Sequence, residues 1–152
     1  MIRIVCVGKE KESYYIEAAQ DYLKRISKYA KVEVIQLPEY KLYDSSNAKT
    51  EKALSEEAKA VKPYLKGMVA VLDSAGQLMT SEEFAKFMNK NLSPGITFVI
   101  GSSIGLSKEI KDSADKVISF GKMTFPHRLM RVILLEQIYR AFCIIHNTPY
   151  HK

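Results

Sequence analysis

Three loops in the sequence have the residue types of a ligand-binding site, and each follows a short apolar run. They are Leu72–Gly76, Gly101–Gly105 and Phe120–Phe125. The loop from Gly101 to Gly105 offers backbone with little side chain before a helix start, which suits a nucleotide or another flat ligand. It lacks the Gly-Lys-Ser/Thr ending of a phosphate-binding Walker loop and does not match G-x-G-x-x-G. A tight strand-to-helix turn is an equal alternative for this loop.

Titratable residues near the C-terminus form a second candidate group. The closing residues Tyr150, His151 and Lys152 combine an aromatic ring, a titratable ring and a cation. Such a set suits RNA contact by stacking and phosphate pairing, and a frayed terminus is the simpler alternative. The histidines and cysteines are His127, His146, His151, Cys6 and Cys143. Their spacing matches no zinc pattern, so we expect no metal.

Five short apolar runs alternate with helical patterns, and these elements must position the loops. The predicted strands are 2–8, 32–37, 68–72, 96–100 and 116–120, the third stopped by 73–76. The predicted helices are 12–29, 50–65, 81–91 and 107–115, and a last helix follows residue 125. Ser81 and Ser107 are the predicted N-caps of the third and fourth helices, and Pro126 lies in the first turn of the last one. Residues 40–47 are polar and turn-like. Because the central runs are apolar on both faces, we predict a three-layer α/β domain with a parallel sheet, whose ligands bind at the carboxyl ends of the strands.

The last predicted helix is apolar nearly all the way round. Its apolar residues are Leu129, Met130, Val132, Ile133, Leu134, Leu135, Ile138, Tyr139, Phe142, Ile144 and Ile145. One sheet covers only one side of a helix, so we predict that another side meets a second subunit in a homodimer. Glu136 and Arg140 form a favourable i, i+4 pair on it.

Composition limits the possible functions. The chain has 152 residues, which suits a single domain spanning 1–152, and a net charge of +6 that falls mainly at its two ends. A basic protein of this kind suits a polyanion such as nucleic acid, although basic surfaces have other uses. Charged residues interrupt the longest apolar stretch, so we expect no membrane span. Buried, reduced cysteines and the absence of a signal peptide predict a cytoplasmic location.

Several segments together resemble a known family. They are IVCVGK near the start, 97–105, MTFPHRLMR (123–131), LLEQIYRAF (134–142) and the closing PYHK. With these segments, the sequence resembles the bacterial ribosomal RNA large-subunit pseudouridine N3-methyltransferases, small members of the SPOUT class. The resemblance covers essentially the whole chain. One departure is Ser102, where the family usually has the second of two glycines.

The resemblance implies a fold, a cofactor and partners. The fold would be an α/β domain with a deep trefoil knot in its C-terminal half, working as a homodimer. The substrate would be large-subunit ribosomal RNA within assembled ribosomes, with no membrane and no DNA partner. The methyl donor S-adenosylmethionine, without a metal, would bind at these residues: Leu72, Gly101, Gly105, Phe120, Gly121, Lys122, Met123, Thr124 and Phe125.

The expected reaction is methylation of N3 of a pseudouridine. Methyl transfer from a sulfonium needs mainly alignment, while the imide nitrogen must lose its proton to a modest base. We expect Tyr150 and His151 to close over the base, with Arg128 or Arg131 on phosphate, and His127 is an alternative base. Two other functions remain open: a non-catalytic RNA-binding or ligand-sensing protein, and a SPOUT methyltransferase with another RNA target.

Overall fold

Neighbouring strands in the sheet all run parallel, as the alternation of apolar runs predicted. The computed structural model describes residues 1–40 and 46–152, and in this part of the chain five strands pair in the order β2-β1-β4-β3-β5. The strands are β1 (Ile2–Val7), β2 (Val32–Leu37), β3 (Met68–Leu78), β4 (Ile96–Ile100) and β5 (Lys116–Ser119). All five residues of β4 are buried, which is typical of a central parallel strand covered on both faces.

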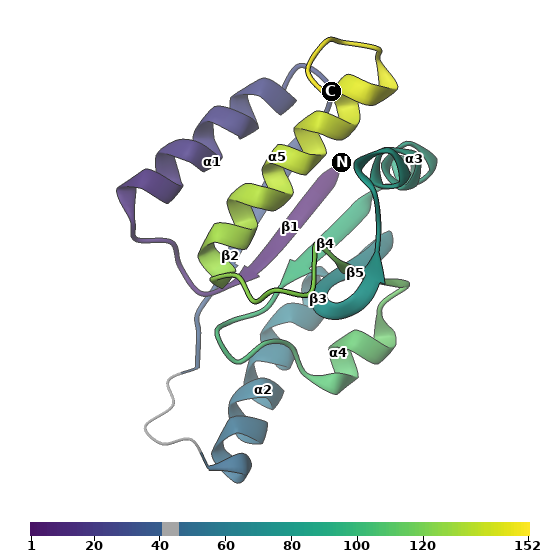
Figure 1. Cartoon of the computed structure of the whole chain (residues 1–152). Helices are drawn as coiled ribbons and strands as arrows, with labels where there is room; N and C mark the ends of the chain where they lie inside the picture. Colours follow the sequence, from purple (N-terminus) through teal and green to yellow (C-terminus); the bar gives the residue numbers. More distant parts are fainter. Residues whose placement is uncertain (41–45) are drawn as a thin grey trace.

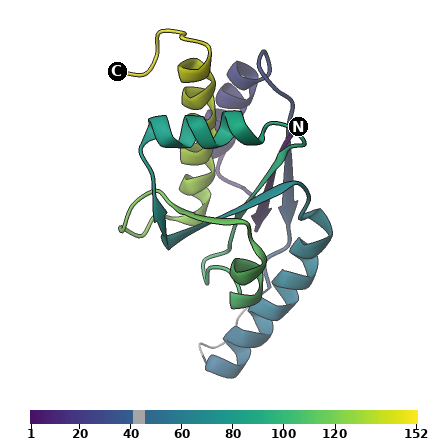
Figure 2. The ribbon, with the colours of Figure 1, turned by 90° about the vertical axis from the view of Figure 1, so that its right-hand side faces the viewer.

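Helices cover both faces of the sheet (Figures 1 and 2), which confirms the predicted three layers. The helices on one face are α1 (Ser13–Ile26), α3 (Ser81–Asn91) and α5 (His127–Ile145). The helices on the other face are α2 (Asn47–Val61), followed by a 3-10 turn (Lys62–Tyr64), and α4 (Lys108–Ser113).

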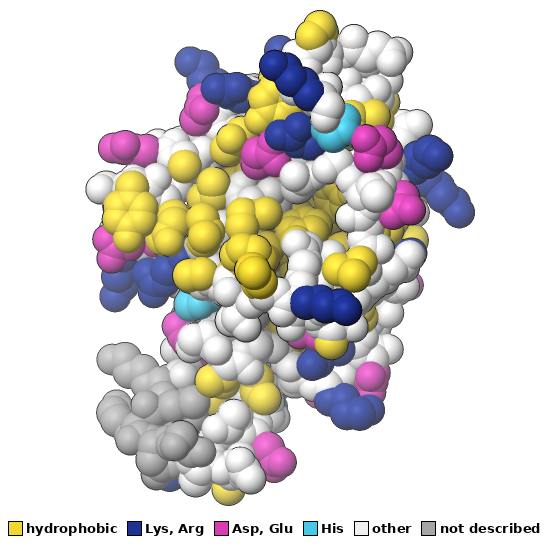
Figure 3. Space-filling model, in the orientation of Figure 1, with side chains coloured by type: hydrophobic (Ala, Val, Ile, Leu, Met, Phe, Trp, Pro, Cys, Tyr) yellow, Lys and Arg dark blue, Asp and Glu magenta, His cyan; other side chains and the backbone are white. Residues whose placement is uncertain are grey.

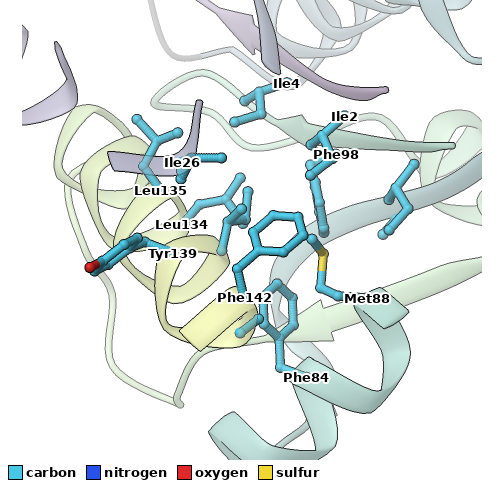
Figure 4. Close-up of a cluster of buried hydrophobic side chains, with 14 of the residues drawn as sticks. Ile2, Ile4, Ile26, Phe84, Met88, Phe98, Leu134, Leu135, Tyr139 and Phe142 are labelled. Atoms are coloured by element: carbon cyan, nitrogen blue, oxygen red, sulfur yellow. The ribbon is translucent and has the colours of Figure 1, made fainter. Parts of the chain in front are cut away.

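The larger hydrophobic core lies between the sheet and the first of these helix layers (Figure 4). Phe84 and Met88 of α3, Phe98 of β4, and Leu134 and Phe142 of α5 are at most 2% exposed in it. The rings of Phe84 and Phe98 pack with centroids 5.9 Å apart. Because five large side chains from three elements meet here, the core fixes α3 and α5 against the middle of the sheet.

Several helix starts differ from the prediction, and α2 begins at Asn47 instead of residue 50. The N-cap of α3 is Thr80, not Ser81, because Thr80 accepts from the Glu83 N–H while the Glu83 side chain accepts from the Thr80 N–H. Pro126 is the N-cap of α5 and lies just before its first turn. Of the predicted turn at 40–47, residues 41–45 lie outside the described part of the chain.

The prediction that the third strand ends at residue 72 was wrong. β3 continues to Leu78, and Leu72 and Gln77 both face Ile118 across a bulge formed by the residues between them. A Cβ on Gly76 would lie 2.8 Å from the Val117 carbonyl oxygen, so only glycine fits this close to the β5 backbone. The Asp-Ser-Ala-Gly sequence therefore forms a bulge beside β5 instead of ending the strand.

The long helix α5 lies between α1 and α3 on the sheet (Figure 1). Tyr139 packs near Tyr22 of α1, with ring centroids 6.4 Å apart, and Gln137 accepts a hydrogen bond from Ser81 of α3. Neighbouring helices of the same chain therefore cover part of the apolar perimeter that we assigned to a second subunit. Within the described residues, no helix has the length and hydropathy needed to cross a membrane.

Candidate functional site

A cavity of about 200 Å³ lies between the bulge of β3 and the carboxyl ends of β4 and β5, where the three predicted loops meet. Eight of the nine residues that the resemblance assigned to methyl-donor binding line it: Leu72, Gly101, Gly105, Phe120, Gly121, Met123, Thr124 and Phe125. The ninth, Lys122, is exposed and does not line the cavity. The structure therefore brings together residues that lie up to 53 positions apart in the sequence.

Glycine is required where the loop after β4 turns. A Cβ on Gly101 would lie 2.5 Å from the Gly105 carbonyl oxygen, so a side chain there has no room. Gly105 has a φ of +82°, and its missing side chain would meet no atom within 4 Å. The loop is thus tightly closed at one glycine and open toward the cavity at the other.

The segment after β5 forms another wall of the cavity. The Ser119 hydroxyl accepts from the Gly121 N–H at 3.1 Å and donates to the Gly121 carbonyl at 2.9 Å, which fixes the turn out of the strand. Gly121 has a φ of +139° and open space where a Cβ would be. Met123, which follows, is 77% exposed, so this wall is partly open to solvent.

The lining includes residues that were not among the nine. Asp73, Ser74 and Ser103 add polar groups and lie within the predicted loops, whereas Leu106 and Met130 add apolar groups and were missed. Leu106 directly follows the predicted loop that ends at Gly105, so the strand-end rule could have included it. Met130 lies one helical turn after Pro126, and only its place in the fold brings it to the cavity.

His127, which we weighed as an alternative base, lines the cavity at the start of α5. Burial lowers the pKa of His127, Glu39 partly opposes this, and the nearby Arg131 and Arg128 lower it further. Its Nε2 atom is buried and has no hydrogen-bond partner. Burial is thus the largest cause of the lowered pKa, and a position at a helix N-terminus also disfavours the imidazolium form.

Arg131, considered above as a phosphate contact, is instead buried under the end of β1. It is 7% exposed, and its Nη2 atom donates to the carbonyls of Val7, at 3.2 Å, and Gly8, at 2.5 Å. Its Nη1 atom donates to Gln36 at 3.4 Å. Arg131 therefore fixes the end of the sheet to α5.

Arg128, predicted to act on the substrate, does not line this cavity. Its guanidinium lies 3.6 Å from Glu10, and its side chain is 27% exposed. Arg128 and Glu10 line a second hollow, of about 210 Å³, between α1 and α5. One face of Arg128 thus remains open to solvent.

The C-terminal residues lie at the opposite end of α5, and they are not frayed. The Tyr150 hydroxyl donates to Glu136 at 3.1 Å, and the Arg140 guanidinium lies 4.7 Å from the Tyr150 ring centroid. His151 contacts Arg140 at 3.1 Å through Nδ1 and Glu82 at 2.6 Å through Nε2. Burial is the largest cause of the raised Tyr150 pKa, followed by hydrogen bonds.

Within one chain, residues 150–152, which we call the tail, do not reach the cavity. The tail contacts Arg140, which lies 13 residues after His127, so the two groups are about 20 Å apart along the helix axis. The predicted pair of Glu136 and Arg140 is confirmed by a hydrogen bond of 2.9 Å, and it holds the tail in place.

Both cysteines are free and buried, as predicted, and burial raises the pKa of Cys6 to about 11. In the ranges 1–40 and 46–152, no group of three or more His, Cys, Asp or Glu side chains is placed to hold a metal ion.

Comparisons with known proteins agree on one family. Residues 1–151 match the family model described as predicted SPOUT methyltransferase. The chain is 48% identical to the putative ribosomal RNA large subunit methyltransferase H of Methanococcus maripaludis and 47% identical to the ribosomal RNA large subunit methyltransferase H of Carboxydothermus hydrogenoformans, over 99% of both chains in each case. 

Solved structures with low sequence identity share the fold. A probable methylase family protein from Haemophilus influenzae superposes with a TM-score of 0.59 at 14% identity, over 99% of this chain and 70% of that one. A probable methyltransferase from Bordetella pertussis gives a TM-score of 0.56 at 11% identity, over 92% of this chain and 95% of that one.

Proposed function

The chain belongs to the SPOUT methyltransferase family, and we propose that it methylates N3 of a pseudouridine in large-subunit ribosomal RNA, with S-adenosylmethionine as the methyl donor. The observation that carries this proposal is the cavity at the bulge of β3 and the ends of β4 and β5, lined by eight of the nine residues expected to bind the donor. A ribosomal substrate would place the enzyme in the cytoplasm, acting as one domain of residues 1–152.

The cavity fits the methyl donor in shape and chemistry. Gly105 and Gly121 leave open space where side chains would otherwise fill the cavity, so backbone can approach a ligand closely. Leu72, Ile118 and Met130 supply apolar surface for a flat base, and Asp73, Ser74 and Ser103 supply polar groups. When bound there, S-adenosylmethionine supplies an electrophilic methyl group.

The residues of the chain must then position the target and take its proton. N3 of pseudouridine becomes nucleophilic when it loses its proton, which a modest base accomplishes. His151 and Tyr150 are the proposed groups at the base, and Arg128, with its open face, is the proposed phosphate contact. The lowered pKa of His127 favours its uncharged form, which can accept a proton, so His127 is the alternative base.

In a homodimer, the tail of one subunit could lie at the cavity of the other, although the two are far apart within one chain. A second copy related by a two-fold axis, with its α5 antiparallel to the first, would bring its tail to the cavity of the first copy. Figure 3 shows hydrophobic side chains gathered over α1 and the first half of α5. Tyr14 is 60% exposed, and Leu129, Val132 and Ile133 are half-buried, so this face can accept a partner.

The trefoil knot of the SPOUT class belongs to this function, because it would hold the cofactor loops together. The bulge of β3 and the segment from Phe120 to Phe125 line the same cavity, which supports such a crossing.

The decisive experiment is mass spectrometry of ribosomal RNA from a strain that lacks the gene. We expect one pseudouridine of the large-subunit RNA to lose its N3 methyl group, and the purified protein to restore it on isolated ribosomes with S-adenosylmethionine. An unchanged modification pattern, with no methyl transfer in vitro, would leave a non-catalytic RNA-binding protein. Transfer to a different nucleotide would identify another RNA target. Sedimentation at micromolar concentration should give about twice the chain mass of 17.3 kDa.

A further inference from the structure

A buried carboxylate joins three segments on the side of the cavity away from α5. Glu57 of α2 is 4% exposed, although its side chain carries an ionisable group. One of its oxygens accepts a hydrogen bond from the Ser102 hydroxyl at 2.8 Å, and the other accepts from the Tyr40 N–H at 2.9 Å. Glu57 thus connects α2, the residues after β2 and the loop after β4.

Ser102 is the residue of that loop through which the connection is made. It is 4% exposed, and its hydroxyl is directed to Glu57, so it does not crowd the cavity. Its carbonyl accepts from the Gly105 N–H at 2.9 Å, which closes the loop. Next to it, the Ser103 hydroxyl donates to Glu39 at 2.9 Å.

The position of Ser102 fixes the two glycines that line the cavity. Gly101 precedes it and lies close to the backbone of Gly105, because a Cβ on Gly101 would be 2.5 Å from the Gly105 carbonyl oxygen. Gly105 is tied to Ser102 by the backbone bridge. A shift of Ser102 would therefore move both glycines and change the shape of the cavity.

A buried carboxylate is costly for the fold, which makes a positioning role the better explanation of Glu57. Burial raises the pKa of Glu57, and the hydrogen bonds from Tyr40 and Ser102 oppose the shift. An apolar side chain in a well-packed helix would avoid this cost. A second glycine at position 102 would supply no hydroxyl to this carboxylate.

We propose that Glu57 and Ser102 form a latch that positions the Gly101–Gly105 loop for methyl-donor binding. Glu57 does not line the cavity, and Ser102 lines it while its hydroxyl is bonded to Glu57, so we assign both as positioning residues. This inference rests on the proposed function, because it assigns the loop to the donor. Loss of the latch should weaken donor binding while leaving the RNA-binding surface in place.

The test compares donor affinity in variants that break or keep the latch. Ser102→Ala and Glu57→Ala should each raise the Kd for S-adenosylmethionine about tenfold, since each leaves a buried group unpaired. Because the two side chains act as a unit, the double variant should be no weaker than the weaker single variant. Glu57→Gln should bind within about threefold of wild type, because its amide can accept from Tyr40 and donate to the Ser102 hydroxyl.

Thr97→Val is the matched control. Thr97 lies on β4 and is buried, as Ser102 is, but it does not line the cavity. Its hydroxyl donates to the Lys66 carbonyl at 2.6 Å. Its loss should lower the melting temperature as Ser102→Ala does but leave the Kd unchanged. Steady-state kinetics on ribosomes should show a raised KM for the donor and an unchanged KM for ribosomes in Ser102→Ala.

Two outcomes would overturn the latch. One is a folded Ser102→Ala protein whose Kd stays within twofold of wild type, and the other is a Thr97→Val protein that loses affinity to the same extent. If Glu57→Ala does not fold, Ser102→Ala with Glu57→Gln still decides the question. Failure of the wild-type protein to bind S-adenosylmethionine would instead contradict the proposed function, so the two failures are distinguishable.

Discussion

The two ends of α5 differ in how their polar groups are paired. At the C-terminal end, hydrogen bonds join Glu136, Arg140, Tyr150, His151 and Glu82 into one network. At the N-terminal end, three buried atoms have no partner in the described part of the chain. They are Nε2 of His127, Nε of Arg131 and Oε2 of Glu10.

The polar groups at the C-terminal end of α5 are therefore paired within one chain, whereas, among the described residues, three buried polar atoms at the N-terminal end are not. A buried polar group without a hydrogen-bond partner costs about 1–3 kcal/mol. Of the three residues, His127 lines the cavity, whereas Glu10 and Arg131 line the second hollow between α1 and α5. The C-terminal end needs no ligand to hold its shape, and we infer that it presents a preformed surface to a second copy.

The largest expected effect is that of Gly105→Val, in the loop after β4 that lines the same cavity as the N-terminal end of α5. Gly105 lines the cavity at a φ of +82°, and valine would add a β-branched side chain to this backbone, so we expect at least a hundredfold loss of S-adenosylmethionine affinity in a protein that still folds. Titration calorimetry measures this loss. Unchanged affinity in a folded variant would mean that the loop is only a turn.

Asn147→Val is the matched control for that variant, because it lies at the other end of α5. Asn147 also has a positive φ, of 53°, so valine there carries a similar backbone strain of roughly 1–2 kcal/mol. We expect a comparable fall in melting temperature and unchanged donor affinity. Loss of affinity in the control would attribute the effect to strain.

Removal of residues 150–152 should affect the opposite end. We expect methyl incorporation into purified ribosomes to fall at least a hundredfold, because the proposed catalytic groups are lost. Donor affinity should stay within about twofold of wild type, since the tail lies about 20 Å from the cavity along the helix axis. The melting temperature should also fall, because Tyr150 packs against the main core. A comparable methylation rate would move the catalytic group to His127 and Arg128.

Mixing the two defective proteins would show whether the ends of α5 work across subunits. A mixed dimer of Gly105→Val and the truncated chain has one intact cavity that faces one intact tail. With random exchange of subunits, about a quarter of the wild-type activity should return. If the tail served the cavity of its own chain, no activity would return.

The pH dependence of stability should differ between wild type and His127→Gln. The folded-state pKa of His127 is lowered, so its contribution to stability is present above the unfolded value near 6.5 and is lost as pH falls through the folded value. Denaturant titrations at pH 7.5 and pH 5.5 should therefore show a smaller loss for His127→Gln. Equal losses would mean that His127 is solvated as in the unfolded chain.

The smallest expected effect is that of Glu82→Gln. The Glu82 side chain is 58% exposed, and exposed ion pairs contribute little to stability. We expect an unchanged melting temperature and a methylation rate reduced no more than about threefold, through a less fixed His151. Glu56→Gln, which alters the exposed Lys59 pair on α2, is the matched control and should change neither quantity.

Local patterns predicted the elements and the cavity because both depend on short-range features. Apolar runs identified all five strands, and the strand-end rule identified the loops that line the cavity. The continuation of β3 could not be predicted, because it depends on a close approach between Gly76 and the backbone of Val117. The same holds for the C-terminal network, since His151 and Glu82 are 69 residues apart.

Ser102 shows a similar limit. Its hydroxyl has two possible directions from sequence alone, and the choice depends on a carboxylate 45 residues away on another layer. Lys122 was assigned to donor binding by its place within a contiguous motif, whereas its side chain lies on the exposed side of the segment. Contacts of this kind depend on tertiary packing, which residue types do not specify.

The strand order has a consequence for how the protein is made. β1 is the first strand to be synthesised, yet it lies between β2 and β4, so one of its edges stays unpaired until β4 has been translated. An unpaired apolar edge is prone to wrong pairing, which favours delayed folding of the nascent chain. The residues that line the cavity extend to Met130 of α5, so a nascent chain contains all of them only after residue 130 has been translated. A ligand of this cavity can therefore stabilise the fold only late in synthesis.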